Sequence, residues 1–441
     1  MSIISYLFSR SRRNQFGSAR WGKPGRDLMK SGLARGEGSF YIGESNRKPV
    51  MLPRMESLRH GLILGGSGFG KSTGYFLPNS QMAAGNSLVC TDPKSELWNL
   101  TAGFHKTPVR YAPCDPDASN CFNWIPLCRD PRLSELCARA IVESGQTGST
   151  EQAWIDTETA FLSGLFAHAS TTPEPTPLTA YRLFTRQTIQ HLIDEMRSSR
   201  SDAARAQAMI LSQTQEKMLG SIVPVVAAKL QFLSDPLVAR FTSADLSPPA
   251  FSGLRERPTA IFWCLQESDM VRLKPLTSLF FSVVLEQLSA KTSNVVPVTL
   301  LLDEFANIGV IPSFDSTIAL SRGRNISIWI GLQSLGQLEA RYGKANAQTI
   351  ISNCGTKIAL SGLDLESAEY ISRSLGDKTE SVGKWSVSGV LNPTYSHSNV
   401  ENARRLLTSD EVRRIPSDKA IVVSGNRRAM LLTKTYLPQQ W

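Results

Sequence analysis

The segment from Gly65 to Ser72 has the residue types and the spacing of a loop that binds phosphate groups. Its sequence, GGSGFGKS, fits the pattern GxxxxGK(S/T) and follows an apolar run of strand type, GLIL. Glycines let backbone N–H groups turn toward phosphate oxygens, Lys71 supplies a positive charge to the terminal phosphates, and the Ser72 hydroxyl can ligate magnesium. The pattern therefore predicts binding of ATP with Mg²⁺, the alternative being a glycine-rich turn that binds nothing. The expected nucleotide-binding residues are Gly65, Gly66, Ser67, Gly68, Phe69, Gly70, Lys71, Ser72 and Thr73.

Two adjacent carboxylates follow an apolar run later in the chain. The segment 298–304, VTLLLDE, ends in Asp303 and Glu304. A motor ATPase needs a carboxylate at the tip of a neighbouring strand to hold the magnesium shell, and Asp303 is the candidate. Glu304 suits a general base that polarises the attacking water, so the pair predicts hydrolysis, with Lys71 as a further catalytic residue. The alternative is a strand that ends in two surface carboxylates.

Two further candidate catalytic residues flank the next apolar run, 326–332. Gln333 follows the run and could sense the terminal phosphate from beside Asp303, although a polar strand end is an ordinary feature. Arg324 precedes the run in the segment SRGRN. A guanidinium there could reach a nucleotide held by a neighbouring subunit, as an arginine finger supplied in trans. Solvated arginines in a loop are the competing interpretation.

The elements that must position these residues alternate along the chain. Apolar runs of strand length occur within 61–113 and at 259–265, 298–304, 326–332 and 356–360. Continuous apolar runs are typical of strands that are buried on both faces, and the segments between them are long enough for crossover helices. The pattern predicts a mostly parallel sheet. At the end of the chain, 420–435 has two apolar runs around a turn and predicts a hairpin, whereas 376–400, rich in Ser, Gly, Lys and Thr, is expected to be an exposed loop.

The composition changes within the chain and suggests three parts. Residues 129–255 are rich in Ala, Gln, Ser, Leu and Arg with few valine runs, which predicts an inserted all-α domain. Residues 56–128 and 256–441 then form an α/β nucleotide-binding domain of the P-loop NTPase class. Residues 1–55 are expected to form a basic N-terminal segment.

The net charge of +10 is concentrated near the start of the chain. Residues 1–60 contain twelve Lys or Arg and four Asp or Glu, an excess of +8. Such a segment can meet nucleic acid or the anionic inner face of a membrane, or it can be a solvated arm. No run approaches the roughly 18 to 20 apolar residues that span a bilayer, so we expect no transmembrane helix. The seven cysteines lack the CxxC pairs of a typical zinc site and are expected to be reduced, cytosolic thiols.

Several stretches together resemble the coupling proteins of type IV secretion systems, the conjugation ATPases of the TraG and TraD type. The resemblance covers nearly the whole chain, and DEFANIG is its most specific part. The stretches are FGSARW (16–21), the phosphate loop, TDPKSEL (91–97), LLDEFANIG (301–309) and GLQS (331–334) followed by Gln337 and Leu338.

This resemblance implies a RecA-like motor that assembles into a hexameric ring with a central passage, beside a helical domain that helps to recognise substrates. The implied partners are relaxase-bound single-stranded DNA, effector proteins and components of the secretion channel. Asp92 and Lys94 would lie near the nucleotide or a subunit interface, although a plain turn accounts for them equally well. Family members usually begin with transmembrane helices, so we expect that the anchor was removed or sits on another polypeptide. The basic start fits the inner face of a bacterial inner membrane.

We therefore expect an ATPase that recruits DNA, protein or both and moves them into a conjugation channel. A second hypothesis is a docking module that binds nucleotide for assembly and turns over very little. A third is a DNA-packaging or chromosome-segregation translocase, which would share the motor chemistry.

Overall fold

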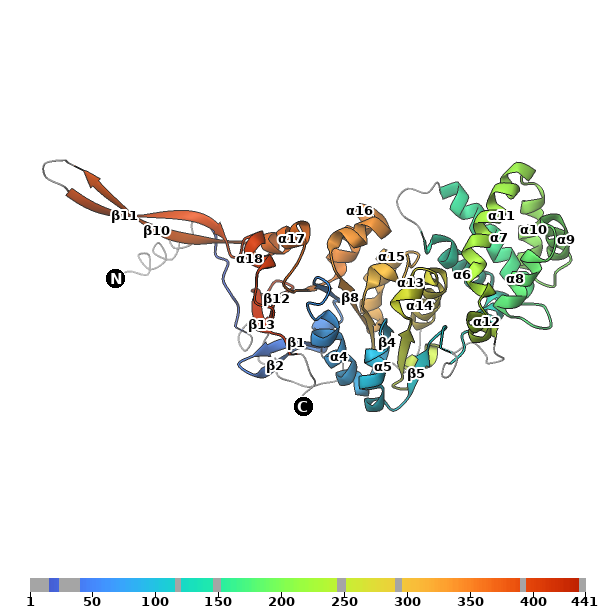
Figure 1. The fold of residues 1–441 in the computed structure, drawn as a ribbon, viewed down its shortest axis with the longest axis horizontal. Coiled ribbons are helices and arrows are strands. Elements are labelled where there is room, and N and C mark those ends of the chain that lie inside the picture. The colour runs from blue at the N-terminus through green and yellow to red at the C-terminus, as the bar shows by residue number, and fades with distance from the viewer. Residues whose placement is uncertain are drawn as a thin grey trace.

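A large sheet with helices on both faces forms the middle of the molecule (Figure 1). A group of helices lies at one end, and a long two-stranded ribbon projects from the other. The computed structural model describes residues 16–23, 40–115, 120–145, 152–243, 251–289, 296–388 and 394–435.

The predicted parallel strands form one side of this sheet. They are Gly61–Leu64 (β3), Ser87–Asp92 (β4), Pro108–Tyr111 (β5), Ala260–Cys264 (β6), Val298–Leu302 (β7), Ile326–Leu332 (β8) and Thr356–Ala359 (β9). Their order across the sheet is β9-β3-β8-β7-β4-β6-β5, and every neighbouring pair is parallel. Each strand coincides with a predicted apolar run, so this part of the prediction is confirmed.

An antiparallel extension continues the sheet beyond β9. Its strands are Phe40–Ser45 (β1), Lys48–Leu52 (β2), Lys419–Ser424 (β12) and Met430–Thr433 (β13). They pair in the order β2-β1-β13-β12-β9, and the β12–β13 pair is the terminal hairpin predicted for 420–435. The predicted boundary at residue 55 does not coincide with an edge of the sheet, because β1 pairs with β13 and β2 pairs with β1. Most of the remaining basic segment lies outside the described residues.

Helices cover both faces because the strands have no polar face. In β7, Leu300 and Leu302 pack into one hydrophobic cluster and Leu301 packs into the other, as the alternation of side chains along a strand requires. The helices of this part are Arg54–Ser57 (α3), Ser72–Phe76 (η1), Leu77–Met82 (α4), Glu96–Thr101 (α5), Glu267–Met270 (α13), Lys274–Ser289 (α14), Phe314–Ser321 (α15), Leu335–Asn353 (α16), Leu365–Leu375 (α17) and Ser409–Arg413 (α18).

The group of helices at one end of the molecule is the predicted insertion between two strands of the sheet. Its helices are Pro131–Glu143 (α6), Gln152–Ala169 (α7), Pro177–Thr185 (α8), Ile189–Arg197 (α9), Asp202–Ser212 (α10), Glu216–Leu230 (α11) and Pro236–Ser243 (α12). The described residues between 131 and 243 contain no strand. Helix α6 packs against both α7 and α14, so it joins the helical part to the sheet. The exact limits at 129 and 255 stay predictions.

Within the part of the chain that the structure describes, one stretch, Glu216–Ser234, is long and apolar enough to cross a membrane by length and composition alone. It is α11 with the turn that follows it. Its residues Leu219, Ile222, Val226 and Leu230 are buried, and α11 packs against α6 and α7. This packing accounts for these four apolar residues, and a single helix of this kind is weak evidence for a membrane span.

The projecting ribbon corrects the expectation of an exposed loop over 376–400. Asp377–Ser388 (β10) and Thr394–Arg405 (β11) are antiparallel and pair from Asp377 with Arg405 to Ser388 with Thr394. The ribbon stands apart from the sheet (Figure 1), so neither of its faces needs an apolar run. Its composition is therefore as polar as that of a loop, which is why the sequence did not indicate strands. At its base, Arg405 donates hydrogen bonds to Glu369 and Ser372 of α17.

A close contact between β3 and β8 generates the first prediction. Gly61 is the register partner of Trp329, and a Cβ atom at position 61 would lie 2.1 Å from carbons of the buried indole ring. The ring has no room to move, because it stacks on Phe40 with centroids 3.4 Å apart and donates a hydrogen bond to Ser327. We expect Gly61→Ala to lower the free energy of unfolding by about 1–3 kcal/mol, the usual cost of overpacking.

Urea unfolding followed by tryptophan fluorescence measures this difference. Gly253→Ala is the matched control, since a Cβ atom there would meet no atom within 4 Å. Equal stabilities of the two variants would show that the β3–β8 contact is looser than described.

Candidate functional site

The phosphate loop connects β3 to η1 at the carboxyl edge of the sheet. Gly68 and Gly70 both have φ of 78°, a left-handed conformation that favours glycine. Lys71 is 5% exposed, and its Nζ donates hydrogen bonds to the carbonyl oxygens of Gly65 at 2.8 Å and Gly66 at 3.4 Å. The loop therefore folds around the ammonium group of Lys71, and η1 begins directly after this residue.

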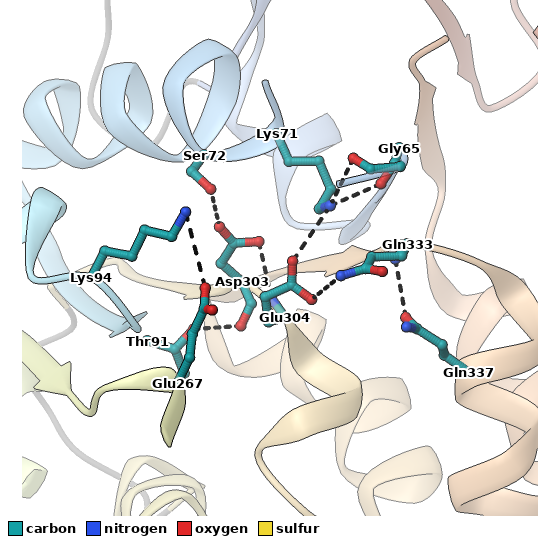
Figure 2. A network of polar contacts seen from close by, with 11 residues as sticks. Gly65, Lys71, Ser72, Thr91, Lys94, Glu267, Asp303, Glu304, Gln333 and Gln337 are labelled. Atoms are coloured by element: carbon teal, nitrogen blue, oxygen red, sulfur yellow. Dashed lines mark hydrogen bonds and ion pairs between the residues drawn. The ribbon is translucent and has the colours of Figure 1, made fainter. Parts of the chain in front are cut away.

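The two predicted carboxylates lie opposite this loop (Figure 2). The Ser72 hydroxyl donates a hydrogen bond to Asp303 Oδ2, and the backbone N–H of Glu304 donates one to Asp303 Oδ1 at 2.9 Å. Thr91 at the end of β4 donates to the backbone carbonyl of Asp303 at 2.8 Å. Asp303 is 4% exposed. The structure thus brings together the loop and the acidic pair, which are more than two hundred residues apart in sequence.

Glu304 is directed toward the loop by its backbone. Its φ of 50° lies in the left-handed region, which is unfavourable for a residue with a side chain and is found in turns and at functional sites. Its Oε1 lies 3.5 Å from Lys71 Nζ, and its Oε2 accepts a hydrogen bond from Gln333 Nε2 at 3.1 Å. Gln333 is held in turn by Gln337, whose Oε1 accepts the backbone N–H of residue 333 at 3.2 Å. Gln333 therefore orients Glu304 from the adjacent strand.

The environment of Asp303 raises the pKa of its carboxyl group to about 6. Burial is the largest cause, and the negative charge of Glu304 acts in the same direction, whereas the hydrogen bond from Ser72 and the charge of Lys71 oppose the shift. A hydroxyl and a buried carboxylate side by side are the hard oxygen donors that Mg²⁺ prefers. Ser72 and Asp303 thus fit the metal-binding role predicted for them.

A cavity of about 420 Å³ opens above these residues. Its walls come from the phosphate loop, the turn after β4, the start of α13 and α14, and the ends of β7 and β8. Among the predicted nucleotide-binding residues, those that line it are Gly66, Ser67, Gly68, Gly70, Lys71, Ser72 and Thr73. Gly65 and Phe69 are not part of the wall. Phe69 packs beside Gly362, and its carbonyl oxygen accepts a hydrogen bond from Lys434.

Asp92 and Lys94 both line the cavity, but Asp92 makes structural hydrogen bonds whereas Lys94 faces a carboxylate across the cavity. The buried Asp92 carboxylate accepts the backbone N–H groups of Leu97 at 3.2 Å and Trp98 at 2.8 Å, so it fixes the start of α5. Burial raises the pKa of Asp92, and these two hydrogen bonds lower it. Lys94 is exposed, and its Nζ lies 4.0 Å from Glu267 Oε1 across the cavity (Figure 2).

One wall of the cavity was missed by the sequence analysis. Glu267, Met270, Val271 and Lys274 line it from α13 and the start of α14. They follow β6, and the carboxyl ends of parallel strands meet at the same edge of a sheet. The apolar run at 259–265 was therefore an available signal, because the residues just after it had to reach this edge.

Arg324 is the one predicted catalytic residue that the structure does not bring to the cavity. It is exposed and lies in the short helix Arg322–Arg324 (η8), directly before β8, whereas Gln333 follows the same strand. The two residues thus lie at opposite edges of the sheet. This position excludes a contact with the nucleotide of the same chain and leaves the trans role a prediction.

The family model for the type IV secretory system, conjugative DNA transfer, matches residues 9–437. The chain belongs to this family. Among curated relatives, it is 27% identical over 390 residues to the conjugal transfer protein TraG of Escherichia coli, covering 79% of this chain and 61% of TraG. It is 26% identical over 399 residues to the protein VirD4 of Agrobacterium fabrum, covering 85% of this chain and 58% of VirD4. The chain therefore spans about three fifths of the length of these family members.

Solved structures of the family have the same fold. The plasmid coupling protein TrwB in complex with ADP and Mg²⁺ matches with a TM-score of 0.70 at 21% identity, covering 88% of this chain and 87% of TrwB. A TrwB fragment in complex with sulphate matches with a TM-score of 0.75 at 20% identity, covering 95% and 94%. The likeness confirms the predicted class, a RecA-like α/β P-loop fold with a mostly parallel sheet and an inserted all-α domain.

The raised pKa of Asp303 generates a prediction about stability. Its folded value of about 6 exceeds the ordinary value of 3.8, so the fold favours the protonated carboxyl group. The stability that follows from this shift is complete below pH 4 and is lost as the pH rises through 6. Asp303→Asn removes the charge. Its amide oxygen can accept the N–H of Glu304, and its amide nitrogen can donate to the Ser72 hydroxyl oxygen once that hydroxyl turns. We expect it to stabilise the nucleotide-free protein at pH 7.5 by about 1–3 kcal/mol.

Thermal unfolding without nucleotide or metal, at pH 7.5 and pH 5, tests this expectation. The stabilisation by Asp303→Asn should be smaller at pH 5, where the wild-type carboxyl group is mostly protonated. A variant that is less stable than the wild type at both pH values would show that Asp303 supports the fold as an anion.

Proposed function

We propose that this chain binds and hydrolyses ATP with Mg²⁺ and uses the reaction to move DNA, alone or with bound protein, into a type IV secretion channel. One observation carries the proposal: the Ser72–Asp303 hydrogen bond and the Lys71–Glu304 ion pair place the loop and the acidic pair around one cavity. Membership of the conjugative DNA transfer family supports the transport function. TrwB, with the same fold, has been solved with a non-hydrolysable ATP analogue and with ADP and Mg²⁺.

Each residue of the cavity has a different role in the proposed reaction. The loop N–H groups and Lys71 bind the phosphates, and Ser72 with Asp303 would hold Mg²⁺, which neutralises charge on the phosphate oxygens. Glu304 exchanges its contact with Lys71 for the attacking water and accepts a proton from it. The water oxygen then bonds to the terminal phosphorus as the bond to the bridging oxygen breaks, which leaves ADP and phosphate. Gln333 positions Glu304 and lines the same cavity, where it would respond to the loss of the terminal phosphate.

The position of Arg324 supports a ring of copies. No arginine is among the described residues that line the cavity, and its cations are lysines: Lys71, Lys94 and Lys274. P-loop enzymes often stabilise the charge of the transition state with an arginine from a neighbouring molecule. We therefore assign Arg324 as the finger that completes the site of the next copy, in a hexameric ring with a central passage.

Cargo and location follow from the family and from the charge of the chain. The proposed cargo is DNA, such as a relaxase-bound single strand, an effector protein, or both, and the partners are components of the secretion channel. The basic excess of residues 1–60 suits the inner face of the bacterial inner membrane. DNA binding that weakens with added salt would distinguish DNA from protein cargo.

Two substitutions separate nucleotide binding from hydrolysis. Lys71→Ala removes the charge that faces the phosphates and should weaken ATP binding. Glu304→Gln keeps the shape of the side chain but cannot accept a proton, so we expect normal ATP affinity with turnover lowered at least about 100-fold. Phosphate release and binding of a fluorescent ATP analogue measure the two effects.

Glu267→Gln is the matched control, because Glu267 lines the same cavity but faces Lys94 and not the loop. Its turnover should stay close to that of the wild type. If Glu304→Gln turned over ATP as fast as the wild type, Glu304 would not be the general base. If no preparation turned over ATP at all, the chain would be a nucleotide-binding docking module and not a motor.

A further inference from the structure

A buried arginine with no partner among the described residues lies at the amino edge of the sheet. Arg255 ends the short helix Phe251–Arg255 (η6) and is 4% exposed. Its Nε and Nη1 are shielded from solvent and make no hydrogen bond within the part of the chain that the structure describes. A guanidinium stays charged in proteins, and burying its N–H groups unpaired is costly. A polar group in this state points to a ligand that the isolated chain does not supply.

The positive charge of Arg324 acts on Arg255. Backbone hydrogen bonds connect their segments, because Val296 N–H donates to the carbonyl oxygen of Arg255 at 2.8 Å and Val298 N–H donates to that of Asn325 at 3.3 Å. Burial lowers the pKa of Arg255 most, and the positive charge of Arg324 lowers it further. Neither arginine has an ion pair with a described residue. Two guanidinium groups that repel each other, with no ion pair to a described carboxylate, form a site that an anion would stabilise.

The anion cannot be the nucleotide of the same chain. Arg324 precedes β8 and Gln333 follows it, and the seven residues of this strand extend over about 23 Å. The cavity, for its part, contains lysines but no arginine among its described lining residues. Among the described residues, the arginine pair has no anion and the cavity has no arginine, and a second copy of the chain would supply each with what it lacks.

We propose that Arg255 and Arg324 of one chain together bind the terminal phosphate of the nucleotide held by the next copy in the ring. The inference rests on the proposed ATPase and adds a second arginine to its single finger. Arg255 remains inside the chain, unpaired, until the neighbouring nucleotide arrives beside Arg324. Binding of nucleotide by one copy thereby relieves an unfavourable charge in the next, which couples assembly of the ring to occupancy of its sites.

Arg255→Met tests the proposal, because it keeps the length of the side chain and removes the charge. At protein concentrations where turnover per chain no longer rises, we expect its kcat to fall at least about tenfold while ATP affinity changes less than about threefold. The nucleotide-free variant should be at least as stable as the wild type. Arg255→Lys, which keeps the charge without the fork of donors, should be intermediate. Arg257→Gln, an exposed neighbour, should behave as the wild type.

A mixing experiment tests the trans arrangement. Lys71→Ala supplies an intact arginine pair, and Arg255→Met supplies an intact nucleotide site, so mixed rings should turn over ATP faster than the sum of the separate variants. If the mixture of Lys71→Ala and Arg255→Met showed no recovery of turnover while a parallel mixture of Lys71→Ala and Arg324→Ala did, the role of Arg255 would be overturned. The role of Arg324 would stand. The role of Arg255 would also be overturned if a loss of stability in Arg255→Met accounted for its lost turnover. The same holds if Arg255→Met were impaired only in DNA binding. An inactive wild type would instead refute the proposed ATPase.

Discussion

The hydrogen bond between Ser72 and Asp303 connects the two halves of the nucleotide site, and most of the local structure exists to permit it. Ser72 follows β3 and Asp303 follows β7, but β8 lies between these strands in the sheet. The bond must therefore pass over the end of β8, at Gly331. A Cβ atom at that position would lie 2.7 Å from Asp303 Oδ1 and 2.9 Å from the ring of Phe76. The absence of a side chain at residue 331 is thus the steric condition for the site.

Unfavourable local features gather around this bond and make sense only in relation to a ligand. Asp303 is buried with a raised pKa, and Glu304 has a left-handed backbone. A cation beside Asp303 would relieve the first of these two. Arg255 at the opposite edge is also buried, and its Nε and Nη1 have no hydrogen-bond partner among the described residues. Such strain is held in place by the packed sheet between the two edges.

The sequence was sufficient to predict the parallel sheet and the centre of the site. Strands buried on both faces leave continuous apolar runs, and the glycine, lysine and carboxylate types of the loop and of 303–304 are dictated by phosphate and metal chemistry. It was insufficient where no such constraint acts. The β10–β11 ribbon carries no apolar run, Glu267 and Lys274 belong to no local motif, and Arg255 differs from other arginines only through its burial, which depends on distant segments.

The most direct measurement of the central claim is the affinity for a non-hydrolysable ATP analogue with Mg²⁺ and with EDTA, in the wild type and in Asp303→Asn. If Ser72 and Asp303 hold the metal opposite Lys71, Mg²⁺ should strengthen binding by the wild type at least about tenfold and should have little effect on the variant. An equal effect of Mg²⁺ on both proteins, or a wild type that does not bind the analogue, would contradict the assignment of this cavity as a Mg²⁺–ATP site.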